Sequence, residues 1–287
     1  MTLTRLLSGA AVAVALQVAF APLPASAQPL PAPTVTRHGV PPVEQLVQAT
    51  IREGWTTARG TRMAALHLRL APGWMTYWRH PGEAGVAPRF DWSASQNLGD
   101  VRTHWPQPVV FEQGGFRTIG YEGELVLPLE VTPARAGRPV VLEGTLQIGV
   151  CDEICIPVEL SVAAVLRGDG AHDRRIAAAL ETAARPAREG GLRGNLRCAV
   201  APAARGLELT LRATLPRQGA TEMMVVELPG ARARIAEHRT WRDGADLLAS
   251  AEVRAPRGEA VSLDRGQVHV TFLGGSRMLE HVGCTSN

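Results

Sequence analysis

Two cysteines stand close together in a chain that contains four cysteines in all. Four residue steps along an extended strand span about 13 Å, whereas the Cα atoms of disulfide-bonded cysteines lie within about 7 Å of each other. A bond between Cys151 and Cys155 therefore requires a turn, which we predict at Asp152 and Glu153 because aspartate tolerates turn conformations. The surrounding run is Gly149-Val150-Cys151-Asp152-Glu153-Ile154-Cys155-Ile156-Pro157.

A disulfide across this turn closes a ring that is too small to constrain the unfolded chain strongly, so its contribution to stability is modest. Short, exposed disulfides are the labile type that exchanges with other thiols, and we predict that Cys151 and Cys155 are the reactive residues. Two alternatives stay open. The pair can be a plain hairpin staple, or its two thiolates can chelate Cu(I), although no histidine or methionine cluster accompanies the pair in the sequence.

The residues between the two cysteines carry negative charge, which bears on their reactivity. Asp152 and Glu153 oppose thiolate formation and should keep the thiol pKa near or above the ordinary value of about 8.5. Strong oxidants instead stabilise the thiolate of their reduced form. The acidic pair therefore favours a relay or reductant that a complementary partner activates, and a thiol pKa below about 6 would contradict this hypothesis.

The other two cysteines, Cys198 and Cys284, lie near the ends of the second half of the chain. One precedes the first predicted strand of that half and the other follows the last. A bond between them would close a loop of 86 residue steps, which corresponds to about 4–5 kcal/mol in the chain-entropy model. We predict a structural disulfide here, with a second redox pair or two free thiols as the alternatives.

The N-terminus predicts export. Arg5 precedes an almost wholly apolar segment over 6–20, and the small residues Ala25-Ser26-Ala27 follow two prolines. This pattern is typical of a signal peptide over residues 1–27 that is cleaved after Ala27. A membrane anchor is the alternative, but the apolar segment is short for a span of about 20 residues. We find no later stretch that is long and apolar enough to cross a bilayer, so we expect a mature chain without a transmembrane segment.

Composition excludes several classes of function. The formal net charge is +3, or about +2 once Arg5 is removed, and all 30 basic residues are arginines interleaved with acids. No basic stripe that would bind nucleic acid results. No Ser-His-Asp, phosphate-loop or zinc-spacing motif is present, so we expect no organic cofactor, no resident metal and a reaction that depends on the cysteine pair alone.

Short apolar runs separated by turn signals predict an all-β chain of two β-sandwiches joined by a short helical linker. After a proline-rich lead-in at 28–42, we place the first sandwich at 43–166, the linker at 167–190 and the second sandwich at 191–287. Within the linker, Asp173 can cap a helix over 174–184. The clearest strand candidates are 63–70, 124–131, 140–148, 207–211, 223–228 and 267–273.

An ordered set of residues resembles the N-terminal periplasmic domain of the thiol:disulfide interchange protein DsbD, over about 40–165. It consists of the run Gly73-Trp74-Met75-Thr76-Tyr77-Trp78-Arg79-His80-Pro81-Gly82-Glu83-Ala84-Gly85, then Pro88, Trp92, Trp105-Pro106-Gln107-Pro108, Gly120-Tyr121 and Leu127-Pro128, and finally Cys151 to Cys155 with Pro157. The likeness is greatest to ScsB-type (suppressor of copper sensitivity) members, whose exported N-terminal region has two immunoglobulin-like domains. The chain departs from DsbD in having three residues between the cysteines, where DsbD has more. We also expect it to have neither a membrane-spanning domain nor a thioredoxin-like domain.

The resemblance implies a periplasmic protein that relays electrons through Cys151 and Cys155 to or from thioredoxin-like or disulfide isomerase proteins, with Cys155 forming the mixed disulfide. A separate membrane electron transporter would supply the electrons, and copper tolerance and cytochrome c biogenesis are the associated processes. The alternative is a non-catalytic copper-handling or protein-docking module. We expect Tyr121 to shield the pair, and we consider His80 and His104 as proton acceptors. The remaining aromatic residues of the motif are expected to anchor the core and loops, namely Trp74, Tyr77, Trp78, Trp92 and Trp105.

Overall fold

The computed structural model describes residues 41–113, 116–168, 170–257, 259, 262–275 and 277–286. The predicted signal peptide and nearly all of the proline-rich lead-in lie outside these residues. Strands dominate the described chain, which confirms the all-β prediction. The described helical elements are α1 (Val43–Leu46), α2 (Arg174–Glu181) and the short 3-10 turn η1 (Arg265–Gln267), and none of the described helices is long and apolar enough to cross a membrane.

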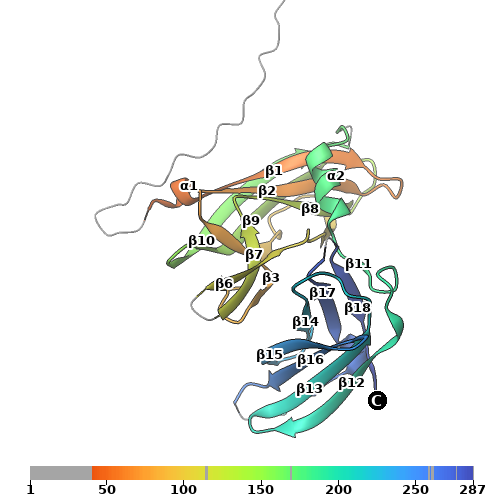
Figure 1. Ribbon diagram of the computed structural model, residues 1–287. Helices are drawn as coiled ribbons and strands as arrows, with labels where there is room; N and C mark the ends of the chain where they lie inside the picture. Colours follow the sequence, from red (N-terminus) through yellow and green to blue (C-terminus); the bar gives the residue numbers. More distant parts are fainter. Residues whose placement is uncertain are drawn as a thin grey trace, which may run out of the picture.

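The residues up to 166 form two sheets, which we call the first pair of sheets (Figure 1). One has the order β1-β2-β8-β5, with β1 (Val47–Thr56), β2 (Arg62–Leu70), β8 (Glu124–Pro133) and β5 (Leu98–Thr103). The other has the order β10-β9-β3-β7-β6 with β4 on β9, and consists of β10 (Cys155–Leu166), β9 (Val140–Cys151), β3 (Met75–Gly82), β7 (Phe116–Glu122), β6 (Val109–Gln113) and β4 (Arg89–Asp91). Alternate side chains of both sheets meet in one apolar core, in which Trp78 is fully buried.

The residues from 185 onward form the second pair of sheets. One has the order β11-β18-β17-β14, with β11 (Arg185–Pro186), β18 (Leu279–Val282), β17 (His269–Leu273) and β14 (Met223–Glu227). The other has the order β15-β16-β13-β12-β19, with β15 (Arg234–Asp243), β16 (Asp246–Arg254), β13 (Gly206–Thr214), β12 (Arg193–Ala203) and β19 (Thr285–Ser286). All six predicted strand runs form strands with shifted ends; in the last, the strand begins only at His269 because η1 occupies the preceding residues.

Strand β14 contacts both cores because its side chains alternate between two buried faces. Met224 and Val226 pack in the core of the second pair of sheets. Met223 and Val225 belong instead to the apolar cluster that contains the core of the first pair. The sheet that carries β14 therefore lies between the two parts of the molecule, and it closes the second core with one face and covers the first with the other.

Helix α2 begins where the sequence predicts it. The Asp173 carboxylate accepts hydrogen bonds from the backbone N–H groups of Arg175 and Ile176, which satisfies donors that have no partner within the helix. The helix ends at Glu181, three residues earlier than predicted, because the chain turns there and extends to pair β11 with β18. The division into domains at 43–166 and 191–287 stays a prediction.

Candidate functional site

The two close cysteines join strands β9 and β10 at the tip of a hairpin. Cys151 and Cys155 are cross-strand partners whose Cα atoms lie 4.1 Å apart, and their sulfurs form a disulfide. Between them, the Asp152 N–H donates to the carbonyl oxygen of Ile154 at 3.1 Å, which closes the turn. The turn between Cys151 and Cys155 that the sequence predicts is thus present.

The two cysteines differ in exposure, although the sequence suggested that the whole ring is exposed. Cys151 is only 1% exposed and packs with Met75, Tyr77 and the half-buried Phe111. Cys155 is exposed. The difference arises because Cys151 ends β9, an inner strand that pairs with β3 on one side and β10 on the other, whereas Cys155 begins β10, the edge strand of the sheet. Cys155 is therefore accessible from outside the molecule, whereas Cys151 is not.

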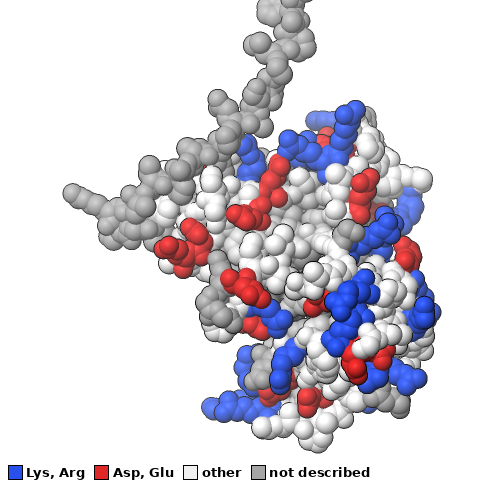
Figure 2. Space-filling view, viewed as in Figure 1, with Lys and Arg blue, Asp and Glu red and all other residues white. Residues whose placement is uncertain are grey.

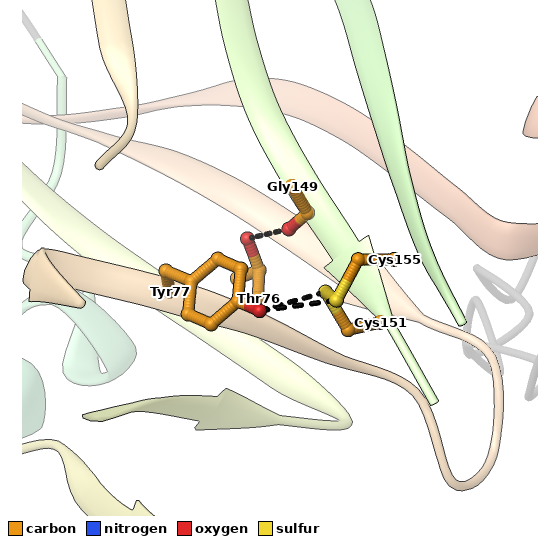
Figure 3. The surroundings of a disulfide bond; sticks show 5 residues. All are labelled: Thr76, Tyr77, Gly149, Cys151 and Cys155. Atoms are coloured by element: carbon orange, nitrogen blue, oxygen red, sulfur yellow. Dashed lines mark hydrogen bonds between the residues drawn. A yellow bond between two sulfur atoms is a disulfide. The ribbon is translucent and has the colours of Figure 1, made fainter. Parts of the chain in front are cut away.

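Tyr77 is the polar side chain that contacts the disulfide (Figure 3). Its hydroxyl oxygen lies 3.1 Å from the Cys155 sulfur and 3.1 Å from the Cys151 sulfur. Disulfide sulfurs carry no hydrogen, so the hydroxyl is the donor. Burial raises the pKa of Tyr77 above its ordinary value of 10.0, and the group therefore stays protonated, and able to donate, at neutral pH.

Close packing on both sides holds the Tyr77 ring in this position. A Cβ atom at Gly149 would lie 2.9 Å from Cε2 of the ring, and one at Gly85 would lie 2.7 Å from Cδ1, both nearer than such contacts allow. On the preceding residue, the Thr76 hydroxyl donates to the Gly149 carbonyl oxygen at 2.9 Å and fastens β3 to β9 (Figure 3). Glycine at 85 and 149 thus leaves the space that the ring fills.

The structure corrects the expectation that Tyr121 shields the disulfide. Tyr121 lies opposite Thr76 in the sheet, so its side chain points to the face opposite that of Tyr77. There it packs in the main core, stacks on Trp105 and donates from its hydroxyl to the Pro106 carbonyl oxygen at 2.8 Å. The sequence had placed Tyr77 among the core anchors, whereas Trp74, Trp78, Trp92 and Trp105 do pack in or against the core.

The two histidines considered as proton acceptors have other surroundings. His104 contacts the Glu130 carboxylate, with Nε2 at 3.2 Å from Oε2. His80 is half-buried near Glu227 and Arg79, and its partial burial lowers its pKa. No described contact joins either imidazole to the cysteine sulfurs, so neither supports a role as proton acceptor.

The surface around Cys155 is partly apolar and partly acidic. A cavity of about 640 Å³ adjoins Cys155 and is bounded by Tyr77, Val86, Ile156 and Pro157, among others. Val86 is 62% exposed and Ile154, in the turn, is 48% exposed. Figure 2 shows acidic side chains on the left flank of the first pair of sheets, where β10 and β6 lie in this view. The exposed sulfur thus faces a surface with features of protein contact sites.

The second cysteine pair is also bonded. The Cα atoms of Cys198 and Cys284 lie 5.7 Å apart, and Cys198 is 1% exposed within the second core. Strand β12, which carries Cys198, pairs with β19, which begins directly after Cys284. The disulfide therefore joins the two ends of the second pair of sheets. Among the described residues, no three histidine, cysteine, aspartate or glutamate side chains cluster as a metal site would require.

Comparisons with known proteins agree with this geometry. Residues 42–166 match the family model described as thiol:disulfide interchange protein DsbD, N-terminal, which confirms the resemblance predicted from the sequence. The crystal structure of the N-terminal periplasmic domain of ScsB from Proteus mirabilis is similar in fold, with a TM-score of 0.57 and 23% sequence identity over 83% of this chain and 92% of that one. No curated protein sequence matches the chain.

Proposed function

We propose that this chain is a thiol–disulfide exchange protein that relays electrons through Cys151 and Cys155 to or from thioredoxin-like partner proteins. The observation that carries the proposal is the arrangement of one exposed and one buried sulfur, both within hydrogen-bond distance of the Tyr77 hydroxyl. A disulfide that served only as a staple would need neither an accessible sulfur nor a donor directed at its leaving group. The match of residues 42–166 to the DsbD N-terminal family supports the same conclusion.

The exchange proceeds by two thiolate displacements. A partner thiolate attacks the Cys155 sulfur, the Cys151–Cys155 bond breaks, and its electron pair leaves on Cys151. The Tyr77 hydroxyl then donates to the new thiolate, which would otherwise carry unpaired charge in a buried site. The partner's second thiolate attacks the partner sulfur of the mixed disulfide and releases Cys155, so that the partner is oxidised and this chain is reduced by two electrons. The reverse sequence reduces a partner disulfide.

The wider setting is part of the same proposal. The chain acts in the periplasm, with a signal peptide cleaved after Ala27, and receives its electrons from a separate membrane electron transporter. The two pairs of sheets are two immunoglobulin-like domains, and the Cys198–Cys284 disulfide braces the second. The periplasmic origin of the similar ScsB domain supports the compartment.

Covalent trapping tests the proposal. In a Cys151→Ala variant, Cys155 attacks a partner disulfide and the chain has no thiol at 151 to resolve the product, so mixed disulfides should accumulate in envelope extracts and disappear on reduction. A Cys155→Ala variant, which retains only the buried thiol, is the matched control and should trap nothing. If neither variant traps a partner, and the purified chain exchanges with no thioredoxin-like protein, the proposal is wrong.

A second candidate function, Cu(I) handling, draws on one further observation. Met75 is the cross-strand partner of Cys151 and is buried with it, so reduction of the disulfide would leave two thiolates and a thioether close together. These are soft donors of the kind that select Cu(I). The sequence alone gave no sign of this methionine beside the pair. Competition of the reduced chain with a Cu(I) chelator tests the idea: Met75→Leu should weaken binding several-fold and leave disulfide exchange intact, and equal affinity of the two proteins would exclude the thioether.

A further inference from the structure

A half-buried arginine of β3, Arg79, joins the two pairs of sheets. The Arg79 guanidinium donates to the Glu227 carboxylate at 3.0–3.2 Å, to the Thr271 hydroxyl at 3.0 Å and to Glu280 at 2.5 Å. These three acceptors lie on neighbouring strands β14, β17 and β18 of the sheet between the two cores. The guanidinium also stacks over the Trp78 ring, 4.5 Å from its centre. Arg79 is thus held on both sides, by the first core and by the second pair of sheets.

A second connection runs through Arg117 of β7, which is paired with Glu83 at the end of β3. The Arg117 guanidinium donates to the His238 carbonyl oxygen of β15 at 3.0 Å and contacts the Glu83 carboxylate. Glu83 in turn accepts the Arg117 N–H at 2.9 Å, and its own N–H donates to the Arg117 carbonyl oxygen at 3.0 Å. The segment from Arg79 to Glu83 is therefore fastened to the second pair of sheets at both of its ends.

Tyr77 lies just before this fastened segment in the chain, and Gly85, just after it, packs against the Tyr77 ring. Tyr77 precedes Arg79 by two residues on β3, the strand that lies next to β14 and β17 in Figure 1. Gly85, two residues after Glu83, lies against the Tyr77 ring and closes its other side. A shift of this segment would therefore displace the ring, and with it the hydroxyl that contacts both sulfurs.

We propose that Arg79 is a positioning residue through which the second pair of sheets holds the Tyr77 hydroxyl on the Cys151–Cys155 pair. The inference rests on the proposed exchange function and assigns the second pair of sheets a part in it. Without the guanidinium, β3 loses its hydrogen bonds to β14, β17 and β18, and the Glu227 and Glu280 carboxylates lose the cation that they share, so nothing of this contact would hold β3 against the second pair of sheets. The Tyr77 ring would then lose its fixed position.

A double-mutant cycle on the reduced full-length chain tests this, with the rate of Cys155 alkylation by iodoacetamide at pH 7 as the readout. Tyr77→Phe should slow alkylation about threefold, Arg79→Ala about twofold, and the double variant no more than Tyr77→Phe alone. Arg52→Ala is the matched control, since it removes another half-buried arginine, paired with Asp173, that is remote from β3. It should lower stability and leave the rate unchanged.

An Arg79→Ala effect that is equally large with and without the Tyr77 hydroxyl would overturn the inference, as would a variant that loses stability while alkylation stays at the wild-type rate. If Arg79→Ala does not fold, Glu280→Gln, which removes one of the guanidinium's two carboxylate partners, completes the same cycle with a smaller effect. Because alkylation needs no partner protein, its outcome is separate from trapping. A Cys151→Ala chain that traps no partner, together with a purified wild-type chain that exchanges with no thioredoxin-like protein, disproves the exchange function, whereas additive rates disprove only the role of Arg79.

Discussion

Replacement of Tyr77 by phenylalanine removes one oxygen atom next to the redox sulfurs and nothing else. The ring that fills the space between the two glycines stays, so packing and stability should change little. What is lost is a donor within 3.1 Å of each sulfur. In the reduced chain that donor stabilises a thiolate, and its removal should raise the pKa of the Cys155 thiol.

The expected change in the alkylation rate of Cys155 follows from two opposing effects of the lost hydroxyl. A hydrogen bond to a charged group contributes about 1.5–3 kcal/mol, and because Cys155 is exposed we take the lower end, which corresponds to about one pKa unit. Below both pKa values the thiolate population then falls about tenfold. The remaining thiolate is more basic and about threefold more nucleophilic, since nucleophilicity rises with pKa with a coefficient of about 0.4–0.5. The net expectation is alkylation about threefold slower at pH 7.

The pH dependence of alkylation gives a sharper check than one rate. Above both pKa values every thiol is ionised, so the variant should react about threefold faster than wild type, and the two curves should cross. Tyr121→Phe is the matched control, because it deletes the hydroxyl of the chain's other tyrosine, which donates to Pro106 instead. Curves that do not cross, or a Tyr121→Phe curve that shifts as far as that of Tyr77→Phe, would refute the reasoning.

Three further predictions concern charge, protonation and the second disulfide. Neutralising Asp152 and Glu153 together, to Asn and Gln, should lower the thiol pKa of the redox pair by about one unit at low salt, which a pH–alkylation curve measures; an unchanged curve would show that the acids do not control reactivity. Burial, assisted by a neighbouring guanidinium, lowers the pKa of His238 to about 4. The unfolded chain therefore binds more protons than the folded chain between about pH 6.5 and 4, and the free energy of unfolding should fall by at most about 3 kcal/mol as pH drops through that range. Denaturant unfolding at several pH values measures this slope, which should be flatter in His238→Gln. Replacing Cys198 and Cys284 by alanine should lower the free energy of unfolding by about 4–5 kcal/mol without changing the alkylation rate of the redox pair, and a changed rate would mean that the second disulfide does more than brace the fold.

Local features of the site were predictable because they depend on short stretches of chain. The turn between Cys151 and Cys155 follows from the reach of an extended backbone, and the cap of α2 follows from the donors that Asp173 can satisfy. The identity of the tyrosine beside the sulfurs was not predictable in this way. Tyr77 and Tyr121 lie on adjacent strands, and which of them faces the disulfide depends on the register of β3 against β7 and β9, where a slip of one residue exchanges the two faces.

The packing partners of strand β14 were also not predictable from its sequence, and they determine how the two pairs of sheets are joined. A continuous apolar run such as Met-Met-Val-Val indicates a strand buried on both faces, but it does not say what covers each face. In the structure one face closes the second core and the other covers the first, beside the acceptors that bind Arg79. Two sandwiches joined by a linker could move independently, whereas a sheet shared between two cores cannot separate from either without exposing apolar surface. The tyrosine that contacts both sulfurs lies on β3, and β3 is fixed by that shared sheet, so the reactivity of the cysteine pair should depend on residues far from it in sequence.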